Sequence, residues 1–73
     1  MSKLPVISGK DCIKALERLG FNIKRQEGSH IVLRKDNPFC QLVVPNHKTL
    51  DRGTLRAIIR QADLSIDEFV NAL

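Results

Sequence analysis

A histidine that follows a glycine and a serine is the residue in this sequence best suited to carry chemistry. His30 comes directly after Gly28 and Ser29, at the start of a segment in which apolar and polar residues alternate. Histidine exchanges a proton near neutral pH, and nearby cations could neutralise the charge that develops on a phosphate during phosphodiester cleavage. An ordinary histidine on a solvent-facing strand would have the same surroundings. The residue pattern alone therefore leaves both interpretations open.

Five further residues are candidates for the same surface. Lys24, Arg34 and Lys48 are cations that could bind phosphates without regard to base sequence. Ser29, directly before the histidine, is placed with them as an RNA contact. His47 follows the last expected strand, and it could be an auxiliary acid, a substrate ligand or an ordinary loop residue.

The sequence predicts neither a metal site nor a cofactor. Zinc ligands usually come in close pairs, whereas Cys12 and Cys40 are far apart and Cys12 falls on the apolar side of an expected helix. Both cysteines are therefore expected to be reduced and packed as small apolar groups. Neither a phosphate-binding glycine loop nor a serine–histidine–acid arrangement can be placed, and the acids are scattered over expected caps and turns. Any phosphodiester cleavage is therefore expected to be independent of metal.

Three helices are expected from periodicity and capping residues. Ser8 is a suitable N-cap for a first helix, whose apolar residues recur at helical spacing until Gly20. A second helix is expected to begin between Asp51 and Thr54, and a last short helix after the capping residue Ser65. The last helix is expected to bury three side chains, those of Phe69, Val70 and Leu73.

Three strands are expected between the first two helices, because apolar residues recur there at every second position. The alternating segments are 21–26, 29–35 and 39–45. Turn residues at Gly28 and at 36–38 indicate short hairpins, and Ile23 is expected to face the core. The side chains expected on the uncovered face of the sheet are Asn22, Lys24, Gln26, His30, Val32, Arg34, Gln41 and Val43.

The order of these elements predicts an α+β fold. The most economical packing places both main helices on one face of a three-stranded antiparallel sheet, with the short C-terminal helix beside them. This is the layout of a double-stranded-RNA-binding-domain-like fold, which by itself does not establish function. A chain of 73 residues is too short for two cores, so residues 1–73 are expected to form a single domain whose active site is a surface rather than a deep cavity.

The composition predicts a cytoplasmic protein, and its basic charge suits a polyanionic partner but is equally what many small soluble domains show by chance. Residues 1–62 carry all twelve lysines and arginines but only five of the eight acids, within a net charge of +4. Neither a membrane-spanning run nor a secretory signal is expected. Three phenylalanines without tyrosine or tryptophan disfavour a binder of single strands built on base stacking, with Phe39 placed neither inside nor outside. The row formed by Arg52, Arg56 and Arg60 could instead dock a partner protein.

Several fragments in order resemble the HicA (YcfA-like) toxin family over nearly the whole chain. They are Gly20-Phe21, Gly28-Ser29-His30, Val44-Pro45 with His47, Gly53-Thr54-Leu55-Arg56 with Ile58, Arg60-Gln61-Ala62, and Ser65 with Glu68-Phe69. Two positions depart from the family pattern. Asn46 stands where a small apolar residue is usual, which leaves the role of His47 open, and Asp63 replaces the glycine that commonly ends the second helix.

The resemblance implies a function. It implies the toxin of a type II toxin–antitoxin system, an endoribonuclease of the mRNA interferase kind with His30 as its catalytic residue. It also implies a HicB-type antitoxin that blocks the active face in a hetero-oligomer. The alternative is a non-catalytic module of the same fold that only binds RNA or a partner protein.

Overall fold

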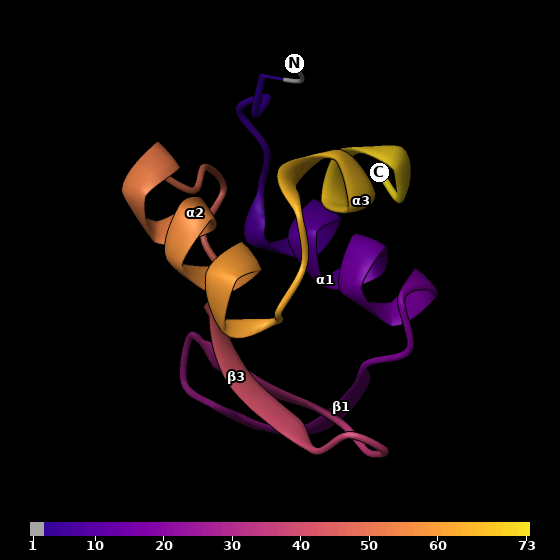
Figure 1. Cartoon of the computed structure of the whole chain (residues 1–73). Coiled ribbons are helices and arrows are strands. Elements are labelled where there is room, and N and C mark those ends of the chain that lie inside the picture. Colours follow the sequence, from indigo (N-terminus) through magenta and orange to yellow (C-terminus); the bar gives the residue numbers. More distant parts are fainter. Residues whose placement is uncertain (1–2) are drawn as a thin grey trace.

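The elements follow the predicted order, with three helices on one side of a three-stranded antiparallel sheet (Figure 1). The computed structural model describes residues 3–73. The elements are α1 (Gly9–Arg18), β1 (Asn22–Glu27), β2 (His30–Lys35), β3 (Cys40–Pro45), α2 (Arg52–Gln61) and α3 (Ile66–Asn71). The sheet has the order β1-β2-β3, so β2 is its central strand. The predicted α+β class is confirmed.

Each helix begins at a side chain that accepts a backbone hydrogen bond from its first turn. Ser8 Oγ accepts from the backbone N–H of residue 11 at 3.0 Å, and Asp51 Oδ1 accepts from the Thr54 N–H at 2.8 Å. At α3 the Ser65 and Glu68 side chains each accept from the other's backbone N–H. Hydrogen bonds to ionised carboxylates favour the charged form. The Thr54 N–H and hydroxyl accordingly lower the pKa of Asp51, and Ser65 lowers the pKa of Glu68 in the same way.

The two main helices end in the same backbone conformation, one at glycine and one at aspartate. Gly20 has φ +101° after α1, and Asp63 has φ +58° after α2. In each case the residue that follows donates a backbone hydrogen bond to the last turn, from Phe21 to the Leu16 carbonyl at 3.0 Å and from Leu64 to the Ile59 carbonyl at 3.2 Å. Glycine occupies this left-handed region without steric cost, whereas aspartate only tolerates it. The aspartate therefore keeps the turn that glycine usually makes.

One apolar core lies between the sheet and the three helices. It includes the buried side chains of Cys12, Leu16, Phe21, Leu33, Val44, Leu55 and Phe69. Both α1 and α2 pack against β3, and α3 packs against α2. The Arg18 guanidinium also donates to the Ala72 carbonyl at 2.6 Å, which ties the end of α3 to α1. The short last helix is therefore integrated with the rest of the fold.

Two side chains expected to be buried are not, because each lies at the edge of the helical layer. Ile23 is 48% exposed, and every residue of the edge strand β1 is exposed. Leu73 is 41% exposed, beyond the last turn of α3, while Phe69 on the same helix is fully buried. The expected apolar sides are correct, but the helices do not reach far enough to cover these two positions.

The two cysteines differ enough in environment to predict different reactivity. Cys12 is fully buried, and burial raises the pKa of its thiol to about 12, so it stays protonated and inert at pH 8. Cys40 is half-buried and donates to the Gln61 carbonyl at 3.0 Å. Iodoacetamide is expected to alkylate Cys40 in the native protein but Cys12 only after unfolding, as read by intact mass. Double alkylation of the native protein, or any label on native Cys40→Ser, would contradict this placement.

Candidate functional site

His30 begins the central strand directly after a two-residue hairpin turn. β1 ends at Glu27 and β2 begins at His30, and these two residues lie directly opposite each other. Gly28 has φ +60°, while Ser29 does not have a positive φ. A two-residue turn matches the twist of the flanking strands when its first residue has a positive φ, and glycine is the residue that this position requires. An added Cβ at this glycine would meet nothing within 4 Å, so the requirement is conformational.

The hairpin turn is tied to the end of β3. The backbone N–H of Asn46 donates to the Ser29 carbonyl at 2.6 Å, and Pro45 lies directly opposite His30. The imidazole is exposed to solvent. Strands on both sides therefore fix the backbone of His30, while the side chain stays accessible to a large ligand.

A β-bulge changes which residues of β1 lie with His30 on the open face of the sheet, which is the face that the helices do not cover. The register shifts between Ile23 and Arg25, so that Arg25 pairs with Val32 and Gln26 with Ile31. Directly opposed residues project from the same face of a sheet. The prediction that Gln26 lies on the open face is therefore wrong, because its partner Ile31 belongs to the core.

Two charged residues that were not predicted from the sequence pattern lie on the open face. Arg25 and Glu27 lie there through their register partners Val32 and His30. They form an ion pair with each other, Nε to Oε1 at 3.1 Å. Lys24, a predicted phosphate contact, is the extra residue of the bulge and is exposed. A carboxylate and a guanidinium thus border His30 in place of an amide.

The centre of the open face is apolar. Val32 is only 3% exposed although it lies on the side away from the helices, because Arg25 and Val43 flank it on the two neighbouring strands. Val43 itself is 44% exposed. The open face is therefore apolar at its centre and polar at its two ends, rather than polar throughout.

Arg34, the predicted cation of the central strand, marks the far end of this face. It lies four residues from His30, about 13 Å along an extended strand. Its Nε is 3.4 Å from Asp36 Oδ1, close enough for an ion pair but without a hydrogen bond. Its guanidinium carbon is 5.9 Å from the ring centroid of Phe39, which is 66% exposed. This end of the face therefore combines an exposed aromatic ring with a guanidinium whose Nε forms no hydrogen bond within residues 3–73.

His47 and Lys48 lie in a separate hollow beside the hairpin. This hollow of about 300 Å³ is lined by Ser8, Lys10, Asn46, His47 and Lys48. The His47 carbonyl accepts from the Gly9 N–H at 2.8 Å, so the start of α1 forms one wall. His30 does not line the hollow, yet its strand partner Pro45 directly precedes Asn46. A cationic hollow therefore adjoins the residue proposed for chemistry without enclosing it.

Replacing Gly9 by alanine is expected to disturb this arrangement. A Cβ at Gly9 would overlap the Pro45 carbonyl oxygen and lie 3.0 Å from Asn46 Cα. Because backbone atoms cannot move aside easily, we expect Gly9→Ala to lower the free energy of unfolding by about 1–3 kcal/mol, measured by urea titration. Lys10→Ala, at the exposed neighbouring position, is the control and is expected to change stability by less than about 0.5 kcal/mol. Equal stability of the two variants would contradict the close approach.

Five of the six predicted residues thus form three groups rather than one, and Lys24 lies apart from them in the bulge of β1. Ser29 and His30 lie at the hairpin, Arg34 lies at the far end of the open face, and His47 with Lys48 lines the hollow. Within residues 3–73, no three side chains of histidine, cysteine, aspartate or glutamate come together as metal ligands.

Comparisons with known proteins identify a family. A family model described as the HicA toxin of bacterial toxin–antitoxin systems matches residues 9–64, from the start of α1 to just beyond α2. A search of curated proteins found no match. No helix within residues 3–73 has the length and apolar character needed to cross a membrane. The matched segment contains the hairpin, the open face and all of the residues that line the hollow except Ser8, and it spans well over half of the sequence. The chain belongs to the HicA toxin family, the toxins of bacterial toxin–antitoxin systems.

Proposed function

We propose that this toxin is a metal-independent endoribonuclease that cleaves mRNA with His30 at the scissile phosphate. The observation that carries the proposal is the position of His30. It is exposed, fixed by strands on both sides and placed directly after the Gly28-Ser29 turn. A general acid or base must be rigidly held and yet accessible to its substrate.

The chemistry requires only groups that the chain and water supply. In RNA, the 2′-hydroxyl can attack the adjacent phosphorus while the bond to the leaving 5′-oxygen breaks. If His30 takes the proton from the attacking hydroxyl, water supplies the proton to the leaving oxygen; if His30 protonates the leaving oxygen, water accepts the proton of the hydroxyl. Cations near the phosphate stabilise the negative charge that develops on its oxygens. Arg25 is close to this point but paired with Glu27, whereas Lys48 and Lys10 line the adjoining hollow and form no ion pair within residues 3–73.

RNA would cross the open face from the hollow towards Arg34. Lys48 and His47 would bind phosphates on one side of His30, with Ser29 as a contact at the turn. Arg34 and Lys24 would bind the backbone further along, because cations bind phosphates without regard to base sequence. A HicB-type antitoxin that covers this face in a cytoplasmic hetero-oligomer would neutralise the toxin.

The proposal is tested with purified protein, a single-stranded RNA and a DNA of the same sequence, in buffer that contains EDTA. Cleavage of the RNA but not of the DNA is expected, because only RNA has the 2′-hydroxyl. Brief induction in cells should likewise deplete mRNA and arrest growth. Intact RNA after long incubation with folded protein would overturn the proposal.

A second function, binding without cleavage, is favoured by a different observation. The exposed side chains of Val43 and Phe39 lie on or beside the open face, and exposed apolar surface often marks a protein interface. A module that only grips RNA or a partner protein would use the same surface. Tight, strongly salt-dependent RNA binding with no cleavage would favour this function over the first.

A further inference from the structure

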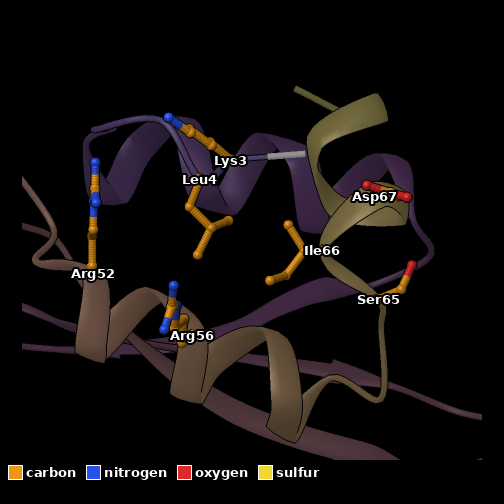
Figure 2. Close-up of a pocket in the computed structure, with 7 residues that line it drawn as sticks. All are labelled: Lys3, Leu4, Arg52, Arg56, Ser65, Ile66 and Asp67. Carbon is orange, nitrogen blue, oxygen red and sulfur yellow. The ribbon is translucent and has the colours of Figure 1, made fainter. Parts of the chain in front are cut away.

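A groove runs between α2 and the beginning of α3, on the helical side of the molecule (Figure 2). Its larger part, about 510 Å³, is bordered by Arg52 and Arg56 of α2 and by Ile66 at the start of α3. A second part of about 450 Å³ also contacts Arg56 and Ile66 and extends to Arg60. Because the two parts share these residues, we treat them as one surface and call it the α2–α3 groove.

The rim of the α2–α3 groove is strongly cationic. Arg52, Arg56 and Arg60 follow one another at intervals of four residues, so each lies about 6 Å from the next along one side of α2. All three are exposed, and within residues 3–73 none of them forms an ion pair or a side-chain hydrogen bond. Lys3 adds a fourth cation at one end, against a single lining carboxylate, that of Asp67. The groove therefore carries a positive charge that the described chain does not neutralise.

The floor of the groove is apolar. Leu4 and Ile59 are buried beneath it, while Leu64 and Ile66 are only partly buried. In Figure 2 the side chains of Leu4 and Ile66 point into the same space, and Arg52 and Arg56 rise from α2 beside it. A ligand that fits must carry apolar groups for the floor and negative charges for the rim.

We propose that the α2–α3 groove docks an acidic amphipathic helix of a partner protein. Carboxylates four residues apart on that helix would repeat the spacing of the three arginines, and its aliphatic side chains would lie on Leu64 and Ile66. An RNA fits less well. Among residues 3–73, the lining contains no aromatic ring or side-chain amide that could stack on or read a base.

The proposal is independent of the ribonuclease function. The groove lies on the helical side, whereas His30 lies at the end of the sheet and shares its outer face with Val32. A helix bound in the groove would leave His30 uncovered. Partner docking and inhibition of the toxin would then be separable properties.

The test is an NMR titration of the full-length, ¹⁵N-labelled protein with a synthetic helical peptide of about 20 residues, long enough to be helical in isolation. The peptide carries glutamates four residues apart and leucines between them. Shift changes are expected at amides of residues 52–61 and 64–67. Arg56→Glu combined with Arg60→Glu should weaken binding about tenfold or more. Lys10→Glu combined with Lys14→Glu makes the same charge change on α1 and should alter binding by less than about twofold.

Two further probes complete the test. If the charge-reversed variant does not fold, Arg56→Gln with Arg60→Gln replaces it and should still weaken binding about threefold. A 2′-O-methyl RNA duplex of about 16 base pairs, which cannot be cleaved through its 2′-oxygen, is titrated in parallel. Absence of shifts in the groove with the glutamate peptide would overturn the proposal. Displacement of the peptide from the groove by the duplex would overturn it in favour of a nucleic-acid site.

Discussion

Replacement of His30 by alanine is expected to slow RNA cleavage by about 10²–10⁴-fold, the usual contribution of a well-placed general acid or base. The imidazole is exposed, and the backbone hydrogen bonds of the hairpin and of β3 do not involve it. The thermal unfolding midpoint should therefore stay within about 2 °C of that of the wild type. Cleavage of a labelled RNA, with unfolding followed by circular dichroism, measures both properties on the same preparation.

The control for this prediction is His47→Ala. His47 lies in the cationic hollow and not opposite the turn, so its loss should raise KM while kcat changes little. The residual activity of His30→Ala, purified in the same way, also gives an upper limit for any contaminating nuclease. A folded His30→Ala protein that retains more than about a tenth of the wild-type rate would exclude His30 as the catalytic residue.

The helix boundaries could be predicted because they depend on local interactions. Ser8, Asp51 and Ser65 each accept a hydrogen bond from a residue three positions later, so the signal and the structure that it specifies lie in the same few residues. The same holds for Gly28, whose positive φ is required by a two-residue turn. The position of His30 at the start of a strand follows directly from that turn.

The bulge in β1 could not be predicted because the sequence does not determine which residues of that strand face the helices and which face away from them. Ile23 is the last apolar residue before the turn, and residues 24–27 are all polar. Because these side chains are all polar, burial of apolar surface does not favour one face of the sheet over the other for any of them. The pairing with β2 decides instead, and it places Arg25 and Glu27 beside His30. A basic and an acidic residue two positions apart were the one available sign that these side chains share a face.

Burial of Phe69 was predictable, and the exposure of Leu73 was not. Helical periodicity indicates the side of α3 on which a residue lies, but only the tertiary structure determines where that side ceases to be covered. Phe69 faces the core, whereas Leu73 follows the last turn and borders a hollow beside α1, next to the Arg18 side chain that donates to the Ala72 carbonyl. The difference between the two positions leads to a prediction about the C-terminal helix.

Replacement of Phe69 by alanine is expected to lower the free energy of unfolding by about 3–5 kcal/mol, the usual cost of removing a fully buried phenylalanine. A chain of this size has only about 4–11 kcal/mol in total. Most of the stability should therefore be lost, although Phe69 lies beyond the segment 9–64 that matches the family. Urea unfolding followed by circular dichroism measures the change.

Leu73→Ala tests the same helix at an exposed position and should cost less than about 1 kcal/mol. Comparison of the two variants measures how much the packing of α3 contributes to stability. Neither residue belongs to the hairpin that carries His30, so the rate of RNA cleavage is tested separately. Because His30 is far from α3, folded Phe69→Ala protein at low temperature should cleave RNA at close to the wild-type rate. If Phe69→Ala cost no more than Leu73→Ala, then α3 would be peripheral, and residues 9–64 alone would hold the fold that positions His30.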